Sequence, residues 1–205
     1  LLEYLETAPI DKQFNFDDLR FPVQYVVRPD LDFRGYSGQL ASGVLRAGQR
    51  ITVLPSGRTS RVRSITTWEG DLPEAFAPMS VTVTLEDEID ISRGDMLVDP
   101  ARMPHVSRRF EAHLVWMSDA ALAANRPYLL KHTTQTTGAT ITALRHRLNI
   151  NSLAQEHPEG LSLNEIGLVE IETARPLFFD SYHLTRSTGA FILIDMEKMH
   201  GFMRS

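Results

Sequence analysis

The sequence predicts an all-β protein built from two consecutive antiparallel β-barrels. Three observations support this prediction. Short strand-like runs recur from residue 21 onward, turn-forming glycines and prolines separate them, and a segment with two prolines divides them into two groups. Closing each group into a barrel would also remove the exposed sheet edges that tend to pair with other chains.

The first group, residues 16–100, is expected to form the first barrel. Its clearest hairpin turn is Pro55-Ser56-Gly57. Six short strands within about 80 residues favour a closed or nearly closed barrel. The expected strands are 21–27, 37–45, 49–54, 59–66, 80–85 and 96–98.

Residues 101–107 are expected to form a linker, because this part of the chain combines prolines with an absence of periodicity. The second barrel is then expected over residues 108–205, with a short helix near 152–155. Its expected strands are 109–117, 128–132, 137–148, 167–173 and 190–195.

Residues 1–15 are expected to be the end of a helix followed by a linker. Leu1, Leu2 and Leu5 have the spacing of one apolar helical face, and Pro9 ends the run. The chain also opens without an initiator methionine, so we expect it to be a fragment of a longer protein.

The composition argues against several functional classes. The 205 residues carry a formal net charge of -5, which argues against a nucleic-acid partner because such proteins need a basic surface. There are no cysteines, so disulfides, thiol nucleophiles and cysteine-ligated metals are excluded. No apolar run approaches the roughly 20 residues of a membrane span, and no signal peptide is recognisable. We therefore expect a cytoplasmic protein without a membrane partner.

Residues 38–43, Gly-Gln-Leu-Ala-Ser-Gly, match the first six positions of a phosphate-binding P-loop. In a P-loop, a lysine and then a serine or threonine follow the second glycine and bind phosphate and magnesium. Here the next residues are Val44 and Leu45, which offer neither a charge nor a metal ligand. We therefore expect a β-hairpin with glycines at its bends instead of a nucleotide site.

The other chemical patterns are weak, and we expect no catalytic, cofactor-binding or metal-binding residue. A nucleophile elbow at residues 35–39 fails because Gln39 replaces the last glycine. The histidines are scattered, and the acidic run at 85–95 lacks the spacing of a calcium loop. Five arginines could form a basic stripe, which leaves an RNA-binding interpretation open: Arg58, Arg61, Arg63, Arg145 and Arg147.

Two runs resemble the second domain of translational GTPases such as elongation factor Tu. They are Phe21-Pro-Val-Gln-Tyr-Val26 and Gly43-x-Leu-Arg-x-Gly48-Gln-x-Ile-x-Val53, and Ile91-Ser-Arg-Gly94-Asp-Met-Leu97 is similar to the end of that barrel. Further segments narrow the resemblance to the large, GTP-binding subunit of bacterial sulfate adenylyltransferase. They are RPDLDFRGYSG (28–38), LPSGRTSRVRSI (54–65), LEDEIDISRGD (85–95), HLVWM (113–117), LNEIG (163–167) and GAFILID (189–195).

The resemblance covers almost the whole chain and implies a division of labour. In that family a GTPase domain binds GTP and magnesium, and the small catalytic subunit makes adenosine 5'-phosphosulfate and pyrophosphate from ATP and sulfate. GTP hydrolysis drives this otherwise unfavourable adenylyl transfer. The two barrels carry neither active site, so the fragment itself is expected to be inactive and to hold no cofactor. Its implied partners are its own GTPase domain, the small catalytic subunit and, in fused relatives, an adenylylsulfate kinase domain.

Two groups of residues are expected to form docking surfaces for these partners. For each of them, turn geometry or an internal salt link is the alternative role. In the first barrel they are Asp32, Phe33, Arg34, Tyr36, Asp90 and Arg93, and in the second they are Asn164 and Glu165. The alternative function is that of the barrels that hold aminoacyl-tRNA in a translation elongation factor.

Overall fold

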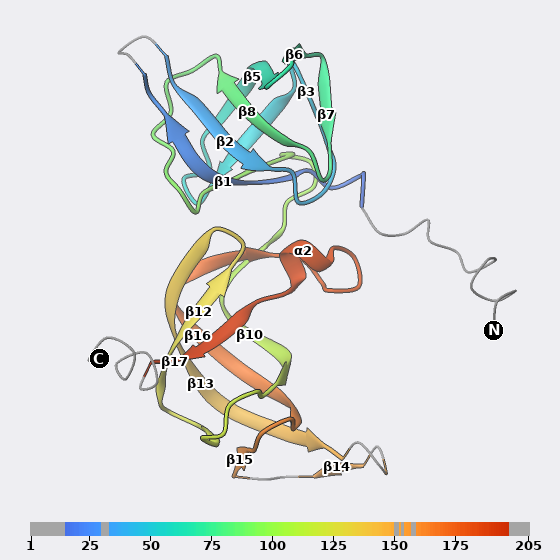
Figure 1. The fold of residues 1–205 in the computed structure, drawn as a ribbon, viewed down its shortest axis with the longest axis vertical. Coiled ribbons are helices and arrows are strands. Elements are labelled where there is room, and N and C mark those ends of the chain that lie inside the picture. The colour runs from blue at the N-terminus through green and yellow to red at the C-terminus, as the bar shows by residue number, and fades with distance from the viewer. Residues whose placement is uncertain (1–14, 30–32, 150–151, 153, 157–158, 197–205) are drawn as a thin grey trace, which may run out of the picture. The chain divides into compact units, whose positions relative to one another are not determined.

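The structure is a computed structural model that describes residues 15–29, 33–149, 152, 154–156 and 159–196. The chain divides into two units (Figure 1). The first comprises Leu1–His105, Thr133–Gln135 and Phe178–Ala190, and the second comprises Val106–His132, Thr136–Leu177 and Phe191–Ser205. The expected helix at the amino terminus lies outside the described residues. No helix in the described ranges is long and apolar enough to span a membrane.

The first unit contains a closed antiparallel barrel. Hydrogen-bonded neighbours follow the order β4-β9-β1-β2-β8-β5, and β5 pairs again with β4, which closes the ring. The ring strands are β1 (Arg20–Val27), β2 (Gly35–Gln39), β4 (Arg50–Leu54), β5 (Thr59–Thr67), β8 (Ser80–Leu85) and β9 (Met96–Val98). A short strand, β6 (Gly70–Leu72), pairs with β5. The expected first barrel is therefore present with nearly the expected strands.

Side chains that alternate between the two faces of each strand fill the interior of this barrel. In β5, Val62 and Ile65 are buried while Arg61 and Arg63 are exposed, and a bulge between Val62 and Ser64 adjusts the alternation. Each fully buried aliphatic side chain stabilises the fold by about 1.5–3 kcal/mol relative to leaving it in water. The hydrophobic core of this unit includes Phe21, Val23, Ile51, Val53, Val81 and Val83.

The single strand expected at 37–45 is wrong, and so is the hairpin expected around residues 38–43. Strand β2 ends at Gln39, and the next strand, β3 (Val44–Arg46), pairs with β7 (Glu74–Phe76). The chain turns between these two strands because Gly43 adopts a φ of 80°, and its N–H donates to the Asn15 carbonyl at 2.7 Å. This stretch is therefore a corner between two sheets.

The hairpin expected at Pro55-Ser56-Gly57 is confirmed. It joins β4 to β5, the Val53 N–H donates to the Arg58 carbonyl at 2.8 Å, and Gly57 has a φ of 71°. Glycine suits this position because other residues rarely adopt a positive φ.

The second unit is built on one antiparallel sheet with the strand order β10-β16-β13-β12-β17. These strands are β10 (His105–Val115), β16 (Ile166–Phe179), β13 (Gln135–Leu148), β12 (Pro127–His132) and β17 (Ile192–Asp195). The rings of Phe110 on β10 and Phe191 just before β17 meet edge to face at 5.8 Å. This contact brings the two ends of the sheet together, as a barrel requires.

The short elements differ from expectation. The helix expected near 152–155 is wrong for the described residues, since Gln155 begins a short strand, β14 (Gln155–Glu156), that pairs with β13. Another pair, β11 (Leu122–Ala123) with β15 (Gly160–Leu161), completes the second unit. A one-turn helix that the sequence did not indicate, α2 (Arg186–Gly189), belongs to the first unit.

Candidate functional site

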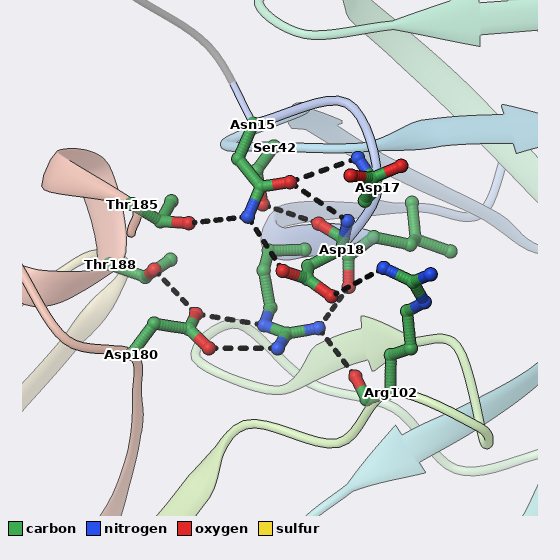
Figure 2. Close-up of polar contacts among 10 residues, drawn as sticks. Asn15, Asp17, Asp18, Ser42, Arg102, Asp180, Thr185 and Thr188 are labelled. Atoms are coloured by element: carbon green, nitrogen blue, oxygen red, sulfur yellow. Dashed lines mark hydrogen bonds and ion pairs between the residues drawn. The ribbon is translucent and has the colours of Figure 1, made fainter. Parts of the chain in front are cut away.

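A buried ion pair joins two distant parts of the first unit (Figure 2). Arg20 begins β1, and Asp180 follows the end of β16. The Arg20 Nε and Nη2 atoms donate to Asp180 Oδ2 and Oδ1, each at 2.8 Å. The Thr188 hydroxyl, from α2, also donates to Asp180 Oδ2 at 2.7 Å. We call these three residues the clamp.

Each guanidinium nitrogen of Arg20 and each carboxylate oxygen of Asp180 has a hydrogen-bond partner. Arg20 is 2% exposed and Asp180 is 9% exposed, so both charges have lost most of their hydration. The remaining terminal nitrogen of Arg20, Nη1, donates to the carbonyls of Leu19 and Arg102, both at 2.8 Å. Two parallel charge-assisted bonds, completed by these carbonyls, offset the cost of burying the charges.

A polar turn at Asn15 lies beside the clamp. The Asn15 side-chain oxygen accepts from the N–H groups of Asp17 and Asp18, at 2.9 and 3.1 Å. Its amide nitrogen donates to Asp18 Oδ2 and to the Thr185 hydroxyl, at 2.6 and 3.2 Å. The Ser42 hydroxyl donates to the Asp18 carbonyl at 2.5 Å, so the corner between β2 and β3 is also joined to this turn (Figure 2).

The clamp fixes the segment 178–190 on the first barrel. Phe178 is buried against Leu54, Met96 and Val98, which form a small apolar cluster outside the main core. At the other end, a Cβ at Gly189 would lie 2.5 Å from the Tyr182 Cα, so only glycine allows the chain to close there. The segment is therefore held by apolar packing at Phe178 and by the clamp at Asp180 and Thr188.

The clamp holds two segments of the chain in place and is not arranged for catalysis. The carboxylate of Asp180 accepts three hydrogen bonds and the pair is shielded from solvent, so neither group is placed to take a proton from a ligand. Sequence reasoning missed this site because 160 residues separate the partners. The available signal was a charged residue, Arg20, directly beside the apolar run that begins at Phe21.

The predicted docking loop of the first barrel contains both exposed and buried side chains. Asp32 lies outside the described residues. Phe33 is 38% exposed, and the Arg34 Nη1 atom donates to the Ile89 carbonyl at 2.9 Å. Tyr36 is 1% exposed and its hydroxyl donates to that same carbonyl at 2.8 Å. Burial raises the pKa of Tyr36, so this side chain belongs to the packed interior.

Asp90 and Arg93 lie on the loop between β8 and β9. Asp90 is exposed, and the Arg93 Nη1 atom donates to the Gln24 carbonyl at 3.0 Å. Burial raises the pKa of the neighbouring Asp95, and the negative charge of Asp90 also raises it. The hydrogen bond that Asp95 accepts from the Ser92 N–H acts in the opposite direction and lowers this pKa. Arg34 and Tyr36 both bond to Ile89, so the structure brings the residues of the two predicted loops together.

A shallow cavity of about 240 Å³ lies beside these loops. It is lined by Phe33, Arg34 and Tyr36, by strand residues Arg63, Ser64, Thr84 and Leu85, and by the acidic residues Glu86, Asp87 and Glu88. No group of three or more Asp, Glu or His side chains in the described part of the chain is arranged to hold a metal ion.

Asn164 and Glu165 occupy a turn in the second unit. The Asn164 N–H donates to the Trp116 carbonyl and the Trp116 N–H donates to the Glu165 carbonyl, so the segments 113–117 and 163–167 lie side by side. The Glu165 side chain accepts from Arg147 Nη1 at 2.5 Å and from the Ser162 N–H at 2.7 Å. The geometry thus gives Glu165 an internal salt link, while a docking role for either residue stays a prediction.

Arg147 also binds a second carboxylate, that of Glu156. Hydrogen bonds from Asn149 and Arg147 lower the pKa of Glu156, and the bond to Glu156 raises the pKa of Arg147. This half-buried network joins β14 to β13.

Comparison with known proteins supports the resemblance seen in the sequence. The chain is 50% identical over 195 residues to sulfate adenylyltransferase subunit 1 of Bacteroides fragilis (strain YCH46), covering 95% of this chain and 41% of the relative. It is 46% identical over 195 residues to the bifunctional enzyme CysN/CysC of Rhodopirellula baltica (strain DSM 10527 / NCIMB 13988 / SH1), covering 95% of this chain and 30% of that relative. The chain spans about two fifths of the length of the subunit 1 relatives that it matches.

The fold has relatives among solved structures. Residues 109–202 match the family described as GTP-eEF1A C-terminal domain-like. A crystal structure of sup35 complexed with GDP superimposes with a TM-score of 0.80 at 18% identity, covering 96% of this chain and 48% of that one. This likeness confirms the predicted architecture of two barrels like those of translational GTPases. Over the portion of that protein that it spans, the chain is therefore similar to sulfate adenylyltransferase subunit 1.

Proposed function

We propose that this chain is the two-barrel portion of the GTP-binding subunit of a sulfate adenylyltransferase. The observation that carries the proposal is the identity of about half the residues over 95% of the chain to subunit 1 relatives. In this proposal the barrels perform no chemistry. GTP and magnesium bind a GTPase domain elsewhere in the protein, and the partner subunit makes adenosine 5'-phosphosulfate from ATP and sulfate in the cytoplasm.

The barrels couple these two activities mechanically. A module that docks differently in two nucleotide states converts a local phosphate contact into a coupling free energy between sites. Such a module must keep its shape, and the clamp supports this role because it fixes the segment 178–190 through buried, fully partnered charges. The predicted surface residues remain the proposed contacts, namely Phe33, Arg34, Asp90 and Arg93 in the first barrel and Asn164 and Glu165 in the second.

Binding measurements on the purified chain test this proposal. We expect no GTP binding by calorimetry and no adenosine 5'-phosphosulfate formation with ATP and sulfate, together with measurable affinity for the purified catalytic partner subunit. Tight GTP binding by the chain alone would overturn the non-catalytic assignment. Salt-sensitive binding of charged tRNA without affinity for the partner subunit would favour the barrels of an elongation factor instead.

A further inference from the structure

Four arginines on the hairpin β4–β5 carry positive charge that no carboxylate of the described residues neutralises through an ion pair. Arg50, Arg58, Arg61 and Arg63 are all exposed, and none forms an ion pair with another described residue. We call this set the arginine hairpin. Ion pairs occupy seven other arginines in the described part of the chain: Arg20, Arg46, Arg102, Arg109, Arg126, Arg145 and Arg147. The arginine hairpin is thus a local concentration of free positive charge on a chain whose net charge is -5.

The register of the hairpin adds a cost to the fold. Arg50 and Arg61 are direct cross-strand partners. Side chains directly opposite each other in an antiparallel pair have Cβ atoms about 5 Å apart, and like charges there are destabilising. A sequence that served only the fold would place an opposite charge at one of these positions. The repulsion therefore indicates a role outside the fold.

Backbone carbonyls hold two of these guanidinium groups in place. Arg61 Nη1 donates to the Gly48 carbonyl at 2.9 Å, and Arg63 Nη2 donates to the Glu86 carbonyl at 3.0 Å. A guanidinium has five N–H donors in a fixed plane, so most of them remain available. Because these contacts already restrict the two arginine side chains, less side-chain entropy is lost when they bind an anionic group.

Two acidic residues that contact β5, Asp87 and Glu86, do not remove this charge. Asp87 accepts a hydrogen bond from the Ser60 hydroxyl at 2.8 Å, and Glu86 meets Arg63 through its carbonyl. Arg63 is the least free of the four arginines, since it lines the same cavity as Asp87, Glu86 and a third acidic residue, Glu88. Arg50, Arg58 and Arg61 are consequently the centre of the surface.

The chemistry of the surface favours an acidic protein over a nucleic acid. Single-stranded nucleic acids are bound by basic grooves that interleave aromatic platforms, and β4 and β5 contain no aromatic residue. The net charge of -5 would also repel a long polyanion beyond this local patch. A folded protein that presents a few carboxylates fits a patch of this size.

We propose that the arginine hairpin docks on the catalytic partner subunit through a surface that presents carboxylates, an inference that rests on the proposed function. The occupant follows from charge complementarity, and relatives named subunit 1 have at least one further subunit. The two arginines of the structure's second unit that the sequence placed in the same basic stripe, Arg145 and Arg147, are neutralised by glutamates. They contribute nothing to this surface.

Charge reversal tests the inference with an internal control for folding. Arg61→Glu and Arg50→Glu each turn the like-charge cross-strand pair into an opposite-charge pair, so we expect a Tm equal to or above that of the wild type. Each should nevertheless weaken binding to the purified partner subunit by about tenfold in 0.1 M NaCl and reduce the salt dependence of the affinity. Arg175→Glu is the matched control, because Arg175 is exposed on β16 in the second unit, and its affinity should equal that of the wild type.

The outcomes separate this inference from the proposed function. If the wild type binds the partner subunit and both reversals bind equally well, the inference is overturned and the proposed function stands. If the wild type does not bind the partner subunit at all, both are overturned. Loss of fluorescein-labelled tRNA binding in the two variants, with partner binding intact, would instead assign the hairpin to nucleic acid. An affinity loss that Arg175→Glu reproduces would also reject a specific site.

Discussion

Replacing Asp180 with asparagine removes one charge from the clamp and almost nothing else. The amide has the size of the carboxylate, so packing around Phe178 and Thr188 is preserved. Arg20 then remains 2% exposed without a counter-ion, and one of its two bonds to residue 180 faces an N–H donor. Asp180→Asn should therefore destabilise the first unit sharply.

The magnitude follows from the contacts. Hydrogen bonds to charged groups contribute about 1.5–3 kcal/mol each, and breaking a buried ion pair by removing one partner costs about 3–5 kcal/mol. We expect the free energy of unfolding to fall by about 3–4 kcal/mol, a large share of the 5–15 kcal/mol typical of a folded domain. Thr188→Val deletes only the hydroxyl donor at 2.7 Å, so about 1.5 kcal/mol is expected.

Urea denaturation followed by far-UV circular dichroism measures these losses, and hydrogen exchange with mass spectrometry localises them. Peptides that cover 15–23 and 178–190 should exchange faster in Asp180→Asn, because the segment loses its anchor to β1. Peptides from the second unit, such as 166–174, serve as the internal control. A loss below 1 kcal/mol, or unchanged exchange in 178–190, would show that the clamp does not hold this segment.

Four further substitutions test other features of the structure. Gly43→Ala should cost about 3 kcal/mol, since the Cβ would lie 2.4 Å from backbone at a φ of 80°, whereas Gly48→Ala, at a φ of 79° in open space, should cost about 1 kcal/mol. Asp95→Asn should raise Tm at pH 7, because a raised pKa means that folding disfavours the carboxylate, and this gain should shrink as the pH falls toward the ordinary Asp pKa of about 4. Arg109→Gln breaks an exposed ion pair with Glu172 at 2.7 Å and should leave Tm within error of the wild type, which a clear drop would contradict.

Local patterns were sufficient to predict most strands. In β5, outward Arg61 and Arg63 alternate with inward Val62, and Pro55-Ser56-Gly57 marks the hairpin that precedes it. Alternation and turn chemistry act over a few residues, so they can be recognised in a single sequence. The pairing of β3 with β7 could not, because it depends on which distant strand lies alongside after the barrel has closed.

Only those candidate docking residues that lie in turns could be predicted from the sequence, because a turn exposes its side chains to solvent. The loops at Phe33 and Asp90 are surface loops as expected, but the same reasoning placed Tyr36 with them, and the structure buries it. Arg20 and Asp180 were not recognised as partners, since each alone resembles any charged residue at a strand end. Separating free arginines from neutralised ones also required coordinates, because Arg61 and Arg145 have similar neighbours in sequence.

The stretch 38–43 shows why glycine spacing alone does not indicate a phosphate site. A P-loop binds phosphate with backbone N–H groups that have no other acceptor. Here the four consecutive N–H groups from Leu40 to Gly43 already donate to carbonyls of the chain itself, namely those of Met79, Arg20 (twice) and Asn15. A phosphate could reach them only by breaking the bonds that attach this corner to β1 and to the Asn15 turn. The glycine at position 43 therefore serves a close approach between backbones within the barrel.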